Sequence, residues 1–127
     1  MDTTKQYVEM CREAMSVLPP YEFKYGDLWS DDRQTVFVVM PLHFPVANCI
    51  PIYRQDQLQE MVGIKDLGIL IYKFISTILH HPEGSNFDSC WIESYWEQFE
   101  SMEQLWLAFV MKEVYQKKWN GENWVQE

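Results

Sequence analysis

The sequence predicts an α+β fold that is mostly helical, with four to five helices around a buried C-terminal helix and a small two- or three-stranded antiparallel sheet. Three observations support this prediction. Apolar residues recur at helical spacing along most of the chain, a β-branched apolar run lies within 34–40, and seven apolar residues follow one another at 105–111. With 127 residues, 47% of them hydrophobic, the chain has the size and composition of a single domain over 1–127.

The first helix is expected to begin after Thr3 or Thr4, because a threonine hydroxyl can accept a hydrogen bond from the first turn. Its apolar face, at helical spacing, consists of Tyr7, Cys11, Ala14, Met15 and Leu18. Pro19 and Pro20 end the helix, since proline cannot continue it. Residues 21–33 contain turn-forming residues and are expected to form a loop.

The antiparallel sheet is expected from two segments, 34–40 and 48–53. The first is continuously apolar in its centre, which predicts a strand covered on both faces. Prolines precede and interrupt the second segment. Because proline has no N–H to donate to a neighbouring strand, this segment is expected at an edge of the sheet or as a short strand.

Two further helices follow the sheet segments. A short one is expected from Gln55 or Asp56 to Val62, where Gly63 stops it. Asp66 is the N-cap of a second and stronger helix. The broad apolar face of this second helix consists of Leu67, Leu70, Ile71, Phe74, Ile75, Ile78 and Leu79.

The last part of the chain predicts two more helices and a turn. The first helix is expected over 89–99. The second begins at Ser101, where Gln104 completes a capping box, and runs to about Lys118. Its first half is apolar all round and is therefore expected to be the most buried part of the protein. A turn at 120–121 is expected to bring the last two tryptophans together.

The charge of the chain excludes two classes of partner. Its 10 basic and 19 acidic residues give a net charge of −9, and residues 81–127 alone carry −6, from three basic and nine acidic residues. Because each phosphate contact needs a cation, direct binding of nucleic acid is not expected. Binding to an anionic membrane surface is not expected for the same reason.

The cytoplasm is the expected location. The N-terminus lacks a basic segment followed by an apolar stretch, so no secretory signal is expected. The longest apolar run, 67–72, is far shorter than the ~20 residues that span a bilayer. The three cysteines are widely spaced and form no CxxC pair, which is typical of a reducing compartment.

The motifs of common enzyme classes are missing from the sequence. It contains no GxGxxG, P-loop, GxSxG or HExxH motif, so neither an enzyme nor a cofactor or metal site is expected. Adjacent helical residues point about 100° apart, so His80 and His81 are poorly placed to chelate one ion. Cys90 beside one of these histidines is the remaining candidate nucleophile, but a buried structural thiol is the favoured interpretation.

An acidic, aromatic-containing stretch at 83–103 is the most informative feature of the sequence, because it holds six carboxylates and no Lys or Arg. On the predicted helix, Glu93, Glu97 and Glu100 share one face at i, i+4 and i+7, where like charges repel. This arrangement is either a solvated face paired at long range or a surface for a basic partner protein. Trp91 and Trp96 are candidate anchors in that contact.

A second polar motif lies between the second sheet segment and the short helix, at Arg54, Gln55 and Asp56. In a structural interpretation, Gln55 or Asp56 caps the helix and Arg54 pairs with a carboxylate. In a functional one, the three residues line a site for a small ligand or a nucleotide, because a helix N-terminus with an arginine can bind an anion.

Three segments of the chain are considered together: YVEMC at 7–11, IYRQDQLQEM at 52–61, and SMEQLWLAFVMKE at 101–113 with the closing WNGENWV at 119–125. In that order they resemble a family of small uncharacterised proteins encoded by phages and prophages of Gram-positive bacteria. The family usually has Trp-Leu-Pro before the Arg-Gln-Asp run, whereas Ile-Tyr precedes Arg54 here. The resemblance implies a phage-borne accessory protein in the host cytoplasm and carries no activity that can be transferred.

These observations favour a non-enzymatic protein that binds a host protein with a basic surface through its acidic C-terminal region. An inhibitor of host antiviral defence is the most concrete form of this hypothesis. The alternative hypothesis is a small-ligand or nucleotide-binding protein that uses the motif at 54–56.

Overall fold

The computed structural model describes residues 1–24, 26–31, 35–39, 49–80 and 91–127. At residue 80 it describes the backbone and not the side chain. The helices in this part of the chain are α1 (Lys5–Ala14), α2 (Gln55–Met61), α3 (Leu67–Ile78), α4 (Ser94–Glu97) and α5 (Met102–Tyr115). The strands are β1 (Leu28–Ser30), β2 (Val36–Val38), β3 (Ile50–Ile52), β4 (Leu79–His80), β5 (Trp91–Ile92), β6 (Lys117–Trp119) and β7 (Trp124–Gln126). The predicted α+β fold, mostly helical with a small antiparallel sheet, is confirmed.

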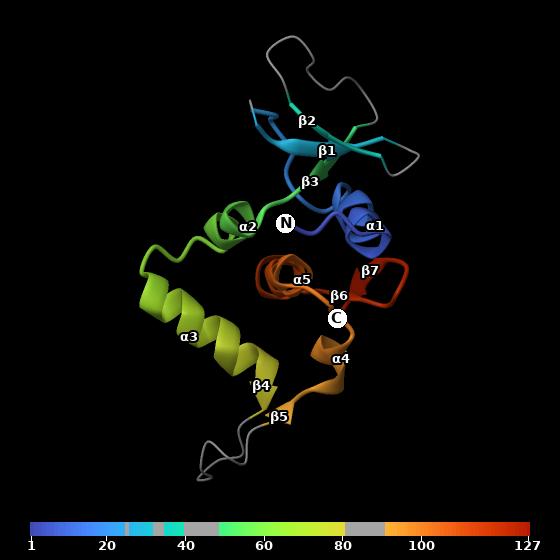
Figure 1. The fold of residues 1–127 in the computed structure, drawn as a ribbon. Coiled ribbons are helices and arrows are strands. Elements are labelled where there is room, and N and C mark those ends of the chain that lie inside the picture. The colour runs from blue at the N-terminus through green and yellow to red at the C-terminus, as the bar shows by residue number, and fades with distance from the viewer. Residues whose placement is uncertain (25, 32–34, 40–48, 81–90) are drawn as a thin grey trace.

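Helix α5 forms the centre of the fold, with α1, α2, α3 and the β6–β7 hairpin around it (Figure 1). Its residues 106–111 are consecutively buried, as the apolar run predicts. Helix α1 is tied to its neighbours by two buried hydrogen bonds. The Tyr7 hydroxyl donates to the Tyr53 carbonyl at 2.7 Å, and the Trp124 indole donates to the Met10 carbonyl at 3.0 Å. These bonds satisfy polar groups that would otherwise be costly to bury.

The N-terminal helix begins as predicted, with Thr4 as its N-cap. The prediction that Met15 belongs to its buried face is wrong, because the α-helix ends at Ala14 and the Met15 side chain is exposed.

The three-stranded sheet has the antiparallel order β2-β1-β3, so β1 is its central strand. The prediction of a loop over 21–33 is therefore wrong at Leu28–Ser30. A turn at Gly26, with φ of +90°, reverses the chain, and the Val39 N–H donates to the Asp27 carbonyl at 2.7 Å. These contacts hold a segment of weak strand propensity beside β2.

Strand β2 lies at an edge of the sheet, and Phe37 and Val38 are exposed. The prediction that both of its faces are covered is wrong for the described residues 36–38, because Phe37 and Val38 point to opposite faces of the strand and both are exposed. The expected edge position of the proline-containing segment is confirmed: β3 lies at the other edge, with Pro51 opposite Trp29.

The C-terminal third differs from the prediction at two helix ends. Residues 89–90 lie outside the described residues, and α4 covers one turn rather than the stretch up to 99. The last helix begins after Ser101 as predicted but ends at Tyr115, because Gln116 adopts a left-handed conformation with φ of 53°. The next residues form β6, and the Trp119 and Trp124 rings meet at 5.0 Å between centroids, which confirms the predicted turn. Among the described residues, no helix is long and apolar enough to cross a membrane.

Candidate functional site

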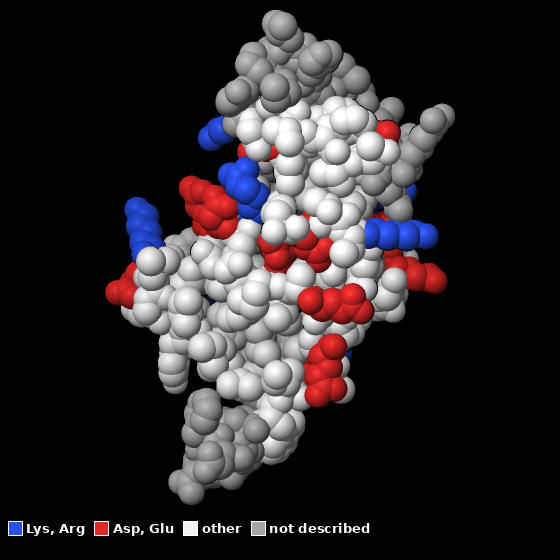
Figure 2. Space-filling model, in the orientation of Figure 1, with Lys and Arg blue, Asp and Glu red and all other residues white. Residues whose placement is uncertain are grey.

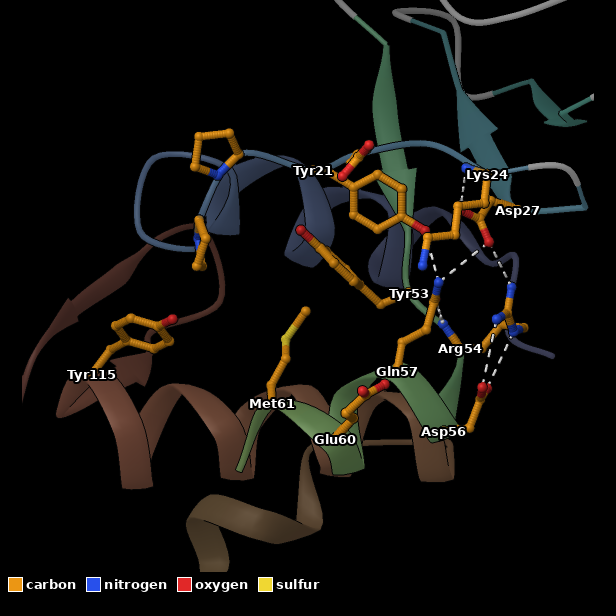
Figure 3. Close-up of a pocket in the computed structure, with 13 residues that line it drawn as sticks. Tyr21, Lys24, Asp27, Tyr53, Arg54, Asp56, Gln57, Glu60, Met61 and Tyr115 are labelled. Atoms are coloured by element: carbon orange, nitrogen blue, oxygen red, sulfur yellow. Dashed lines mark hydrogen bonds and ion pairs between the residues drawn. The ribbon is translucent and has the colours of Figure 1, made fainter. Parts of the chain in front are cut away.

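Two regions correspond to the candidate sites in the sequence. One is an open cleft of about 480 Å³ between the segment that follows α1 and the start of α2. Figure 3 shows this cleft with its walls formed by Tyr21, Tyr53, Met61 and Tyr115. The other is the segment from β5 through α4, which carries the predicted acidic residues.

Arg54 lies at the rim of the cleft and is paired with two carboxylates of its own chain. Its Nη1 lies 2.9 Å from Asp27 Oδ1, and its Nε lies 3.1 Å from Asp56 Oδ1 (Figure 3). The hydrogen bonds to Asp27 and then Asp56 raise the pKa of the guanidinium above its usual value. The predicted pairing of Arg54 with a carboxylate is therefore confirmed.

The cap of α2 differs from the prediction. Arg54, and neither Gln55 nor Asp56, occupies the N-cap position, and its backbone N–H donates to the Gln57 side-chain oxygen at 2.8 Å. Gln55 is the first residue of α2 and is not among the described residues that line the cleft. The structure thus places Arg54 and Asp56 at the cleft and leaves Gln55 beside it.

Asp27 connects the sheet to α2, and sequence reasoning missed it by treating Gly26-Asp27 only as a turn. Its buried carboxylate accepts hydrogen bonds from the Lys24 backbone N–H at 2.8 Å, from Arg54, and from Gln57 Nε2 at 3.3 Å. Burial alone would raise the pKa of Asp27, but its interactions with the Lys24 N–H, Tyr21 and Arg54 outweigh burial, and the pKa lies below its usual value. A charged residue beside a turn glycine was the only signal available in the sequence.

The charges around the cleft are mixed. Two cations, Lys24 and Arg54, lie among four carboxylates, which are Glu22, Asp27, Asp56 and Glu60. The hydroxyl of Tyr21 accepts a hydrogen bond from Gln57 Nε2 at 2.7 Å, and burial raises the pKa of Tyr21 to about 12. The cleft therefore presents tyrosine rings and carboxylates more than positive charge, and its arginine already has two partners.

The acidic segment does not form the predicted helix face. Glu93 is the N-cap of α4, Glu97 is its last residue, and Glu100 lies in the link to α5. The helix stops because Ser101 must be extended, with φ of −141°, to cap α5, and because the Glu100 N–H donates to the Gln104 side chain at 3.0 Å. All three glutamates are nevertheless exposed.

The two tryptophans of the acidic segment have different environments. Trp96 is 3% exposed and packs in the core, so its predicted role as a surface anchor is wrong: it points inward with Phe99 beneath the single turn of α4. Trp91 is 52% exposed. Lys118 places a cation at this segment, because its Nζ is 4.9 Å from the centroid of the Tyr95 ring in α4. Carboxylates are visible on the side of the molecule that carries α4 (Figure 2).

Among the described residues, no group of three His, Cys, Asp or Glu side chains is placed to hold a metal ion. Burial raises the pKa of the Cys11 thiol to about 12, which keeps it protonated. The candidate nucleophile Cys90 and the side chains of His80 and His81 lie outside the described residues.

No family model, curated protein or solved structure matches this chain.

Proposed function

We propose that this chain is a non-enzymatic protein-binding module that engages a basic surface of a partner protein through β5, α4 and the link to α5. The contact residues are Trp91 and three glutamates, Glu93, Glu97 and Glu100. Given the resemblance to phage- and prophage-encoded proteins, the partner is a host protein in the bacterial cytoplasm. A component of host antiviral defence is the target that best fits a small acidic accessory protein.

The observation that carries this proposal is the half-exposed indole of Trp91 beside exposed carboxylates. A tryptophan exposed by 52% leaves much apolar area in water, and tryptophan is among the residue types that contribute most to binding. Neither Glu97 nor Glu100 forms an ion pair with another described residue. Such carboxylates would attract a basic partner at low salt and lose that attraction as salt rises.

The test is retention of a host protein by the immobilised chain from a Gram-positive bacterial lysate, followed by titration with the purified partner. Changing Glu93, Glu97 and Glu100 together to Gln is expected to abolish retention and leave the melting temperature unchanged. A matched control changes three exposed glutamates elsewhere, Glu22, Glu60 and Glu122, to Gln and should retain the partner. Equal retention by both triple variants would overturn the proposal.

A second candidate function is favoured by the cleft itself. An open volume of about 480 Å³ with tyrosine walls is large enough for a small molecule. The paired state of Arg54 makes a nucleotide phosphate a poorer fit than a ligand that carries positive charge. Thermal shift against a panel of nucleotides and of amines tests this function, and the absence of stabilisation by every compound would count against it.

A further inference from the structure

Helix α3 leaves a continuous row of large apolar side chains uncovered. We call this row the α3 stripe. It consists of four residues of α3, which are Leu67, Ile71, Tyr72 and Ile75, together with Ile92 of β5. Each of these side chains is between 44% and 74% exposed. Scattered exposed apolar residues are normal on a protein surface, but a contiguous row along one helix marks a contact site.

The geometry of α3 explains why the stripe is continuous. Leu70, Phe74 and Ile78 recur every four residues and face α5, where the Phe74 ring stacks on Trp106 at 4.0 Å between centroids. Since successive residues turn by 100°, Ile71 and Ile75 follow immediately beside that buried line, on one flank of the helix. Leu79, the residue after α3, pairs with Ile92, so the exposed Ile92 lies at the C-terminal end of the helix.

The stripe itself carries no charged side chain, although the protein is acidic. Between 67 and 79 the only charged residue is Lys73, which lies on the other flank and pairs with Glu113 of α5 at 3.1 Å. The surface along α3 is white over most of its length in Figure 2. Two copies of a chain with net charge −9 repel each other elsewhere, so a face without carboxylates is where they can approach.

The area is sufficient for a weak but specific dimer. Large side chains expose on the order of 200 Å² when fully accessible, so the α3 stripe offers on the order of 500 Å² per chain. Two copies would together bury about 1,000 Å², which is the lower limit for a specific interface. The apolar residues of α3 extend beyond the buried line onto one flank, whereas Lys73, Ser76 and Thr77 lie on the other.

We propose that the chain forms a two-fold symmetric homodimer in which the α3 stripes of two copies pack antiparallel. A helix of 12 residues is about 18 Å long, so the antiparallel arrangement places the Leu67 end of one stripe on the Ile75 end of the other. Each patch then contacts the same patch of the other copy, as a two-fold axis requires. A basic partner would gain nothing from a surface without carboxylates, and an anionic membrane would be repelled by the chain as a whole. The proposal is independent of the proposed function, because that function uses other residues. They are Trp91, which precedes Ile92, and the three glutamates that follow it.

The experiment is light scattering coupled to size-exclusion chromatography over a series of protein concentrations. The wild-type mass should rise from 15.3 kDa toward twice that value as the concentration increases. The double variant Ile71→Ser with Ile75→Ser should stay at the monomer mass with an unchanged circular dichroism spectrum. The matched control is Ile69→Ser, which removes an exposed isoleucine of the same helix that lies off the stripe, and it should dimerise like the wild type.

Three results would overturn the proposal. A wild-type mass that stays at the monomer value at every concentration would do so. So would a dimer that persists in the double variant, or one that Ile69→Ser disrupts equally. Because dimer formation stabilises the folded state by mass action, the melting temperature of the wild type, and not that of the double variant, should also rise with concentration. A wild-type chain that dimerises but retains no host protein would reject the proposed function alone.

Discussion

Helices α5 and α3 are both strongly apolar in sequence, but the structure surrounds one and only half covers the other. Helix α5 is enclosed by α1, α2, α3 and the C-terminal hairpin, and its residues 106–111 are all buried. Helix α3 lies at the outside of the molecule and buries a single line of side chains. An apolar sequence therefore does not by itself decide how completely a helix is buried, because burial depends on how many neighbours pack on it.

The largest expected effect comes from truncating the buried Trp106 of α5, compared with the exposed Trp91 of β5. Trp106→Ala should lower the free energy of unfolding by about 3–5 kcal/mol, because it removes a fully buried ring that stacks on Phe74. Trp91→Ala, at an exposed position beside α3, should change it by less than about 0.5 kcal/mol. Urea denaturation measures both values. Similar losses for the two variants would break the comparison.

The next effect concerns the carboxylate that joins the sheet to α2. Asp27→Ala should lower the free energy of unfolding by about 2 kcal/mol, since the Lys24 N–H, Arg54 and Gln57 lose a common acceptor. Asp56→Ala is the matched control, because its carboxylate also pairs with Arg54 but is well exposed, and it should cost about 0.5 kcal/mol or less. Equal losses would mean that the Arg54 pairing, and not burial of Asp27, provides the stability.

Acid should reveal a second buried carboxylate, Asp2, which anchors the N-terminal segment to the start of α5. Burial alone would raise its pKa, but hydrogen bonds from Ser101 at 2.5 Å, from Thr4 and from Gln104 at 2.8 Å outweigh burial and lower it. A carboxyl with a lowered folded pKa stabilises the fold above its unfolded pKa of about 3.9 and loses that contribution as pH falls through the folded value.

Melting temperatures between about pH 5 and pH 2 should therefore fall less steeply for Asp2→Asn than for the wild type. The variant should be less stable at neutral pH by about 1 kcal/mol, because the amide accepts hydrogen bonds without the charge. The exposed Asp66, which caps α3, supplies the control variant Asp66→Asn. Parallel acid profiles for wild type and Asp2→Asn would show that the anchor does not depend on ionisation.

The smallest expected effect is on the ion pair between α3 and α5. Lys73 and Glu113 are partly exposed, so Lys73→Ala should cost about 0.5 kcal/mol at low salt, and less at high salt because ions screen the pair. Denaturation at two salt concentrations measures this difference. A salt-independent loss above about 2 kcal/mol would show that α3 is held mainly by this charge pair and not by its buried line of side chains.

Much of the fold could be predicted because local signals and tertiary packing agree. Thr4, Asp66 and Ser101 all cap the helices expected from their side chains, and the apolar run of α5 is buried. Strand β1 could not be predicted, since its three residues form a strand only through pairing with both neighbours. The prediction of two covered faces for the segment at 34–40 failed for a related reason. Exposure of the faces depends on which other elements pack on the sheet, and the composition of one strand does not report this.

The candidate sites were predictable only in part. The pairing of Arg54 with a carboxylate followed from its chemistry, but its principal partner Asp27 lies 27 residues away and no local pattern reveals it. The inward direction of Trp96 depends on where α4 stops, which is set by the cap of the following helix. The single covered line on α3 was hidden for the same reason, since periodicity identifies an apolar face and does not say how many neighbours cover it.

In the proposed dimer, a second copy of the chain covers α3, whereas α5 is covered within one chain. Amide hydrogen exchange at two protein concentrations, roughly a hundredfold apart, tests this difference most directly. The amides of α3, at 67–78, should become better protected at the higher concentration, while those of α5, at 102–115, should keep the same protection. Protection of α3 that is identical at both concentrations would contradict it.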